Sequence, residues 1–139
     1  MSRGFQPRPD REVFAWPLRI ESADIDENGH VNNVVYVRWL QDVGTAHWGA
    51  RFSDEERRPW SWVGLRHEID YFRPLFPGDA VQALTWVGDA AGARFDRFVR
   101  IEGPQGLCAQ GRTEWCLVKA DTLKPARIPP GMVERLAAR

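Results

Sequence analysis

Apolar positions along the chain follow two different periods, and the change of period separates one expected helix from several expected strands. From Asn32 or Asn33 to about Ala50, apolar side chains return every three or four positions. That spacing puts them on one face of an α-helix and predicts a helix of about 17 residues. The recurring positions are Val35, Tyr36, Trp39, Leu40, Val43 and Trp48.

Five other stretches have the short apolar runs or the two-residue alternation of β-strands. One precedes the helix and four follow it, at residues 11–21, 62–74, 80–88, 91–103 and 106–120. Pro17 restricts the first to a sheet edge or a bulge, because proline cannot donate to a neighbouring strand. Glycine-containing turns separate the last three, as in a meander of hairpins. The pattern predicts an α+β domain, in which an antiparallel sheet of about five strands wraps around one long helix.

Two of these strands carry an unexpected polar residue on an apolar face. In the stretch after the helix, one face comprises Val63, Leu65, His67, Ile69 and Tyr71. In the stretch 91–103, one face comprises Phe95, Arg97, Val99 and Ile101. We therefore expect His67 to be a hydrogen-bonded histidine of the core or of an interface, and Arg97 to be buried at an interface.

Length and composition fit one domain, residues 1–139, with a hydrophobic core of its own. The chain has 139 residues, of which 43% are apolar, so we expect it to fold rather than stay disordered. Residues 1–10 are polar with two prolines, and we predict a loose N-terminal arm there. Residues 121–139 are predicted to form a polar, proline-rich tail that ends in a short turn of helix.

Charge and targeting signals narrow the possible classes of function. The 19 basic and 19 acidic residues give zero net charge, whereas nucleic-acid and anionic-membrane binders usually have a basic excess. We therefore expect neither partner. No stretch approaches the ~20 apolar residues of a membrane span, and the start, MSRGFQPRPDREVF, lacks the apolar core of a signal peptide. We expect a cytoplasmic protein, in which Cys108 and Cys116, about 26 Å apart on one strand, are buried free thiols.

The most unusual stretch is residues 24–33, DIDENGHVNN, where acids, a histidine and asparagines crowd in front of the expected helix. Its beginning, D-x-D-x-N-G, matches the first half of a calcium-binding EF-hand loop. Such a loop needs a glutamate at its twelfth position, which here is Val35. A transition-metal site built on Asp26 and His30 would need ligands that the stretch does not contain. We therefore predict no metal and no cofactor.

Two interpretations of this stretch remain open from the residues alone. Asp or Asn before a helix is a good N-cap, because its side-chain oxygen accepts the free backbone N–H groups of the first turn. The same helix end, with its unpaired N–H groups and partial positive charge, can hold the carbonyl oxygen of a thioester or ester as it becomes negative. A nearby carboxylate can then attack the carbonyl or activate water. The stretch is therefore either a structural cap or half of an acyl-transfer site as well.

The longer stretch DIDENGHVNNVVYVRWLQDVG resembles the helix-entry motif of hotdog-fold acyl-CoA thioesterases, the 4-hydroxybenzoyl-CoA thioesterase-like family. HEIDYFRPLFPGD is similar to the strand and turn that follow the helix in that family. The order of one strand, a long helix and four strands fits the hotdog fold over residues 11–120. The resemblance implies hydrolysis of an acyl-CoA substrate to a free acid and coenzyme A. It also implies a homodimer or homotetramer with active sites shared between subunits.

The resemblance also implies roles for single residues. Asp26 matches the family's catalytic carboxylate, which acts as nucleophile or general base. Asn33 matches the position whose backbone N–H polarises the thioester carbonyl, and Gly29 matches the turn glycine. The residues expected to contact substrate are Gly29, Val31, Asn32 and Tyr36.

A second similarity leaves the carrier of the acyl group open. N-x-H-V-N-N resembles the catalytic segment of plant-type acyl-ACP thioesterases, in which the residues that match Asp26, Asn28 and His30 are functional. Those enzymes also use an acid or thiol shortly after the next strand, where this chain has RPLFPGD. An acyl-ACP thioesterase is therefore the first alternative. A non-catalytic hotdog protein that binds an acyl or aromatic ligand is the second.

Overall fold

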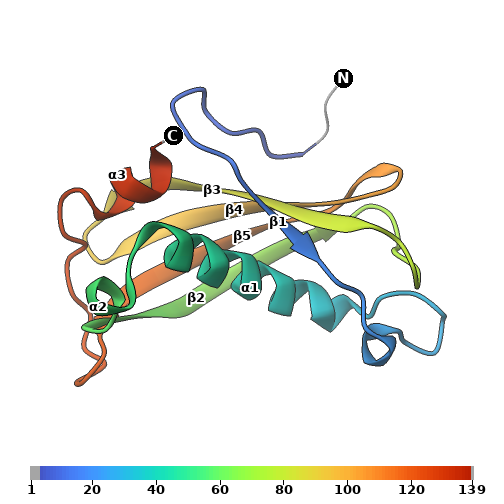
Figure 1. Ribbon diagram of the computed structural model, residues 1–139, viewed down its shortest axis with the longest axis horizontal. Helices are drawn as coiled ribbons and strands as arrows, with labels where there is room; N and C mark the ends of the chain where they lie inside the picture. Colours follow the sequence, from blue (N-terminus) through green and yellow to red (C-terminus); the bar gives the residue numbers. More distant parts are fainter. Residues whose placement is uncertain (1–3, 139) are drawn as a thin grey trace.

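The computed structural model describes residues 4–138, and its centre is a long helix held by a curved sheet (Figure 1). Helix α1 (Asn33–Arg51) lies along one face of a five-stranded antiparallel sheet. The strands are β1 (Phe14–Leu18), β2 (Trp60–Tyr71), β3 (Val81–Ala91), β4 (Arg94–Gly103) and β5 (Gly106–Lys119). The short helical segments are η1 (Ser22–Asp24), α2 (Asp54–Arg57) and α3 (Met132–Ala137). The expected hotdog arrangement is confirmed, and α1 extends one residue beyond the predicted end.

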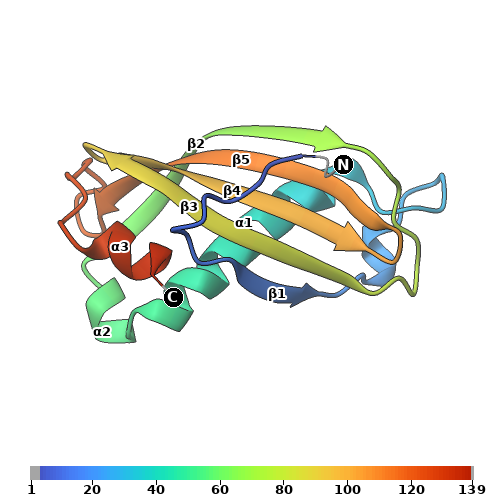
Figure 2. The same cartoon turned by 90° about the horizontal axis from the view of Figure 1, so that it is seen from above.

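The strand order is β1-β3-β4-β5-β2, so the two strands nearest to α1 in sequence form the two edges of the sheet (Figure 2). The hairpins β3–β4–β5 form the middle. β1 pairs only with β3 and contains Pro17, as expected of an edge strand. β2 pairs only with β5 over its whole length, which leaves the other side of β2 without a neighbour in the described part of the chain.

Helix α1 packs on the sheet through two separate apolar clusters, one for each half of the helix. The first half contributes Val35, Tyr36, Trp39, Leu40 and Val43. The second half contributes Trp48 to a cluster that includes Phe95, Leu117 and Leu136. Helix and sheet touch closely at Gly111 of β5, where an added Cβ would lie 2.7 Å from Cδ1 of Leu40. A polar layer of His47, Thr85 and Arg97 lies at the second half of the helix, where each side chain is buried.

Strand β2 differs from the alternation that the sequence predicts, because it contains a β-bulge between Gly64 and Arg66. The extra residue reverses the alternation of the two faces, as a bulge does. Val63 and Leu65 are therefore 41% and 45% exposed, so the single apolar face expected for residues 63–71 is wrong in its first part. Trp60 and Trp62 pack against the core instead.

After the bulge, His67 and Ile69 of β2 lie on the inner face of the sheet, as predicted. His67 is half-buried and its Nδ1 lies 2.9 Å from Oγ1 of Thr113. The histidine therefore has the hydrogen-bond partner that we expect of it. The two cysteines are free and buried, also as expected.

The described part of the N-terminal arm lies on the side of the sheet opposite to α1 (Figure 1). The backbone N–H of Phe5 donates to Oε1 of Gln110 at 2.6 Å, and Nη1 of Arg100 donates to the carbonyl of Phe5 at 2.9 Å. The Phe5 ring meets the ring of Phe98 edge to face. Residues 4–10, expected to be loose, are therefore attached to the outer face of the sheet.

The C-terminal stretch ends in α3, which contributes to the second apolar cluster. Its buried side chains are Met132, Val133, Leu136 and Ala137. They pack with Trp48 and Phe52 at the C-terminal end of α1. The region predicted as a tail therefore completes the core at this end of the sheet.

Candidate active site

The turn before α1 is closed by its own backbone. Ile25 and Val31 form an isolated antiparallel bridge, and inside it the N–H of Asp26 donates to the carbonyl of His30 at 2.9 Å. The N–H of Gly29 donates to the carbonyl of Asp26 at 3.0 Å. Gly29 has a φ of +82°, a conformation that glycine adopts without strain. Asp26 and His30 are thus held at the base of a tight, hairpin-like turn.

The Asp26 side chain is fixed on one side and accessible on the other. Its Oδ1 accepts the backbone N–H of Asn28 at 2.9 Å, and its Oδ2 lies 3.7 Å from Nδ1 of His30. The second separation is too long for a direct hydrogen bond, so the two side chains are neighbours. The Asp26 side chain is 20% exposed, which leaves it open to an incoming group.

The start of α1 has both a cap and a free donor. Oδ1 of Asn32 accepts the N–H of Val34 at 3.2 Å, and the carbonyl of Asn32 accepts the N–H of Val35 at 3.0 Å. The N–H of Asn32 itself donates to the carbonyl of Asp24. Within residues 4–138, no atom accepts a hydrogen bond from the N–H of Asn33. The cap that the structural interpretation expects is therefore present, and so is the unpaired N–H that the functional interpretation requires.

Asp24 and Asp26 differ sharply in their surroundings. Asp24 is buried, and both of its oxygens accept hydrogen bonds from the Arg38 guanidinium, at 3.0 and 3.1 Å. Arg38 holds the pKa of Asp24 below its usual value of 3.8. Oδ2 of Asp24 also accepts the N–H of Glu21 at 2.9 Å. Asp24 therefore anchors the turn, whereas Asp26 has no arginine partner among the described residues.

Val31 and Tyr36 lie behind the turn in the first apolar cluster, and each is 2% exposed. The Val31 N–H donates to the carbonyl of Leu75 at 2.8 Å. Burial raises the pKa of Tyr36 to about 12, and its ring meets that of Tyr71 edge to face. The Tyr71 hydroxyl in turn donates to the carbonyl of Asn33 at 3.0 Å. These side chains pack under the helix start on the core side. Asn28 and Asn32 are exposed to solvent.

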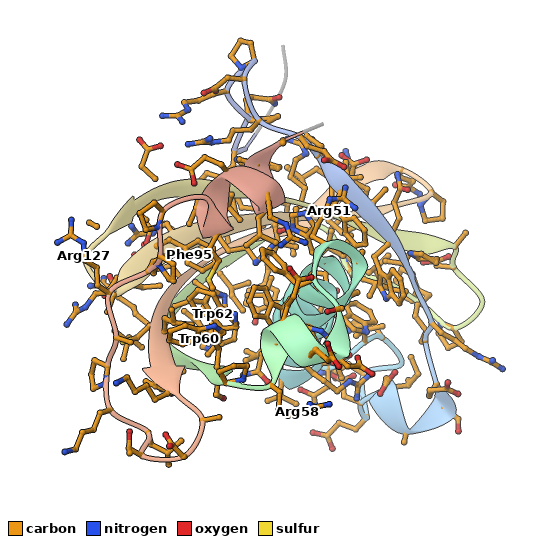
Figure 3. All side chains as sticks on the ribbon, turned by 60° about the vertical axis from the view of Figure 1, so that its left-hand side comes forward. Arg51, Arg58, Trp60, Trp62, Phe95 and Arg127 are labelled. Carbon is orange, nitrogen blue, oxygen red and sulfur yellow. The ribbon has the colours of Figure 1, made fainter. Side chains whose placement is uncertain are left out.

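A cavity of ≈ 410 Å³ lies beside the second half of α1, away from this turn. Its walls are largely aromatic: Trp48, Trp60, Trp62, Phe95 and Trp115. Figure 3 shows three of these rings, Trp60, Trp62 and Phe95, together between the sheet and the helix. Exposed residues at its rim, among them Gln41, Thr45 and Ser61, connect it with the surface.

Sequence reasoning did not find this cavity. Its lining comes from α1, β2, β4, β5 and α3, so no short motif marks it. Only two signals pointed to it: the tryptophans at alternate positions 60 and 62, and the arginine on an apolar face at position 97. Arg97 is buried within one protomer and lines the cavity.

The described residues contain neither a cluster of potential metal ligands nor a membrane-spanning helix. Within residues 4–138, no group of three or more His, Cys, Asp or Glu side chains is placed to hold a metal ion. In the same part of the chain, no helix is both long and apolar enough to cross a membrane.

Solved structures with the same architecture come from several bacteria. A hypothetical protein from Staphylococcus aureus in complex with CoA has a TM-score of 0.80 and 18% identity, over 94% of this chain and 85% of that one. A thioesterase from Thermus thermophilus, complexed with coenzyme A and Zn, has a TM-score of 0.77 and 25% identity, over 92% and 99%. A 1,4-dihydroxy-2-naphthoyl-CoA thioesterase from Synechocystis has a TM-score of 0.75 and 18% identity, over 88% and 96%.

Sequence comparisons agree with the structural ones. Uncharacterized proteins of two Mycobacterium tuberculosis strains are 25% identical over 126 residues, which is 91% of this chain and 50% of each relative. The chain therefore spans about half the length of the curated relatives that it matches. The model of the thioesterase-like superfamily matches residues 20–136, from the end of β1 through α3. The chain belongs to the thioesterase-like superfamily.

Proposed function

We propose that the protein is an acyl-CoA thioesterase, which hydrolyses its substrate to a free acid and coenzyme A. The observation that carries the proposal is the free N–H of Asn33 at the start of α1, next to the turn that holds Asp26. Acyl transfer needs a donor for the developing oxyanion and a nucleophile or base for the carbonyl carbon. This segment offers one of each, and the solved relatives with bound coenzyme A support an acyl-CoA as the substrate.

In the proposed reaction, the thioester carbonyl accepts a hydrogen bond from the N–H of Asn33, and the partial positive charge of the helix end stabilises its oxygen. Asp26 either attacks the carbonyl carbon or takes a proton from a water molecule that attacks it. The tetrahedral species collapses with loss of the thiolate, which takes up a proton and leaves as the thiol. His30, 3.7 Å from Asp26, is placed to relay that proton. If Asp26 is the nucleophile, the collapse leaves a mixed anhydride on its carboxylate, and a water molecule then hydrolyses that anhydride to release the free acid and restore Asp26.

We further propose that two copies of the chain pair along β2. This edge strand is long, its outer side has no neighbour in the described part of the chain, and it exposes Val63, Leu65 and Tyr71. Unpaired strand edges pair readily with another strand. The isologous, antiparallel arrangement of a two-fold dimer would bring the C-terminal end of one β2 to the N-terminal end of the other.

That pairing would join the two regions described above. Tyr71, at the C-terminal end of β2, contacts Asn33 at the start of α1. Trp60 and Trp62, at the N-terminal end of β2, line the aromatic cavity. In such a dimer, the Asp26 carboxylate of one protomer faces the aromatic cavity of its partner. Analytical ultracentrifugation should give a dimer or a multiple of it, and a charge placed on the edge by Val63→Lys should dissociate it.

Asp26→Asn is the direct test of the catalytic role. The amide can neither attack the carbonyl nor accept a proton, so kcat should fall by three orders of magnitude or more while the fold is kept. Glu27→Gln is the matched control, because it removes the same charge from an exposed neighbour on the same turn. Thiol release by Asp26→Asn at a rate near that of the wild type would overturn the assignment.

The proximity of His30 and Asn28 to Asp26 favours a second candidate, an acyl-ACP thioesterase that uses His30 and Asn28 as well. Initial rates on one acyl group carried by coenzyme A and by acyl carrier protein would separate the two candidates. If ACP is the carrier, kcat/KM is higher on acyl-ACP and falls strongly in His30→Ala. If CoA is the carrier, the preference is reversed.

A further inference from the structure

The aromatic cavity contains a single formal charge, which no other charge neutralises. Arg97 is 3% exposed, and it is the one charged residue among those that line the cavity. Its Nη1 donates to Nδ1 of His47 at 2.9 Å and to Oγ1 of Thr85 at 3.1 Å. Among the residues that the structure describes, no carboxylate pairs with Arg97, and nothing accepts from its Nε or Nη2. A buried charge without a counter-charge is costly, and it is rare unless something pairs with it.

His47 cannot supply the missing negative charge. Burial, followed by the charge of Arg97, lowers the pKa of His47 to about 3, so the imidazole is neutral and its Nδ1 accepts from Arg97 without adding a negative charge. Burial also lowers the pKa of Arg97 to about 9, which leaves the guanidinium protonated at neutral pH. The cationic charge therefore persists in the cavity.

The Arg97 side chain packs closely against helix α1. Gly44 of α1 faces it, and an added Cβ would lie 3.3 Å from Nε and 3.4 Å from Cδ of Arg97. Glycine is less favourable than alanine inside a helix, and here its missing Cβ lets the Arg97 side chain approach the helix backbone. The buried indole N–H of Trp115, another lining residue, also has no acceptor among the described residues, but it is not accessible from the cavity.

We propose that this cavity binds the far end of an acyl group that carries a carboxylate there, with Arg97 as its counter-charge. A guanidinium presents a fork of donors that matches a carboxylate. The aromatic walls hold the apolar part of the acyl group, whether it is a ring or a short chain. The inference rests on the proposed function, in which the thioester lies at Asp26 of one protomer and the acyl group enters the cavity of its partner.

Matched substrate pairs test the preference. The carboxylated members are 4-carboxybenzoyl-CoA and adipoyl-CoA, and the neutral members are 4-methylbenzoyl-CoA and hexanoyl-CoA. We expect kcat/KM of the wild type to be at least tenfold higher for the carboxylated member of one or both pairs. Arg97→Met should lower that ratio at least a hundredfold, mainly by slowing the carboxylated substrate. Arg94→Met is the control, because Arg94 is an exposed arginine of the same strand and its loss should leave the ratio unchanged.

A binding measurement separates this inference from the proposed function. Tryptophan fluorescence of the wild type should respond saturably to 4-methylbenzoate and at least tenfold more weakly to 4-methylbenzamide. Arg97→Met should lose that difference. If no acyl-CoA is hydrolysed but the difference is present, the thioesterase proposal fails and the anion site stands. If neutral substrates are hydrolysed as fast as carboxylated ones and benzoate binds no better than the amide, the anion site is overturned. If Arg97→Met does not fold, the comparison of 4-methylbenzoate with 4-methylbenzamide on the wild type still tests the anion site.

Discussion

The two halves of helix α1 differ in composition and in surroundings. The N-terminal end is polar, with a closed turn, a side-chain cap and a free N–H group, all within residues 24–35. The C-terminal half is aromatic and surrounds a buried arginine, and its surroundings come from four other elements. The first region is local in sequence, whereas the second exists only after the sheet has closed over the helix.

The contrast has a physical reason. Reaction chemistry at a helix end uses backbone donors, which every helix has, so it needs only a suitable turn before the first residue. Selectivity needs a shaped cavity, which a single segment cannot enclose. We therefore expect changes at the N-terminal end to affect turnover, and changes at the cavity to affect stability or the choice of substrate.

The largest expected effect is on stability and comes from the cavity side. Trp48 is 8% exposed and packs its ring against those of Phe52 and Trp62. Trp48→Ala should lower the free energy of unfolding by about 3–5 kcal/mol, as truncation of a large buried side chain does. Urea denaturation measures it. Val34→Ala, at an exposed position of the first turn of α1, is the control and should change the free energy by less than about 0.5 kcal/mol.

The same contrast explains what the sequence could predict. The helix, the five strands and the edge position of β1 follow from periodicity and from Pro17, because these signals are local. The candidate turn could also be predicted, since its residues are contiguous. The structure adds to that prediction the difference between Asp24, which forms an ion pair with Arg38, and Asp26, which has no arginine partner among the described residues.

The cavity could not be predicted in the same way. The bulge in β2 reverses the alternation after Gly64, so the inward position of Trp60 and Trp62 contradicts a simple two-residue period. No residue type marks a bulge reliably, because strand pairing decides where the extra residue is accommodated. Arg97 was recognised as anomalous, but a partner such as His47, fifty residues earlier, is known only from the fold.

The next largest effect is the pH dependence of stability, and it arises from His47 near the cavity. The pKa of His47 is lowered from 6.5 to about 3 in the folded protein, so below pH 6.5 the unfolded chain binds a proton that the folded chain does not. Stability should therefore fall as the pH decreases, by about 2 kcal/mol between pH 7 and pH 5. Chemical denaturation at both pH values should show this loss. His47→Gln retains an acceptor for Arg97 and should reduce the loss, and an identical loss in the variant would contradict the role of His47.

At the N-terminal end, the corresponding pH effect is smaller and occurs at lower pH. The ion pair with Arg38 lowers the pKa of Asp24 below 3.8, so its contribution is complete above that value and disappears as the pH falls through the folded-state pKa. Asp24→Asn should cost about 1–2 kcal/mol at pH 7, because Arg38 is half-exposed and water can solvate it. Denaturation at pH 7 and below pH 3.5 should show the difference shrinking. Asp42→Asn, which removes an exposed carboxylate 3.9 Å from the same arginine, should have little effect at either pH.

The smallest expected effect on stability tests the helix cap and separates it from the reaction. Asn32→Ala removes the acceptor for the N–H of Val34 and should cost about 1 kcal/mol. Asn32→Ser restores a capping oxygen and should recover most of that loss in thermal denaturation. If the free N–H of Asn33 holds the oxyanion, loosening of the first turn should also lower kcat in Asn32→Ala, and Asn32→Ser should restore it. An unchanged kcat in a measurably destabilised Asn32→Ala variant would mean that the cap and the oxyanion donor are independent, and that the two parts of this helix end can be altered separately.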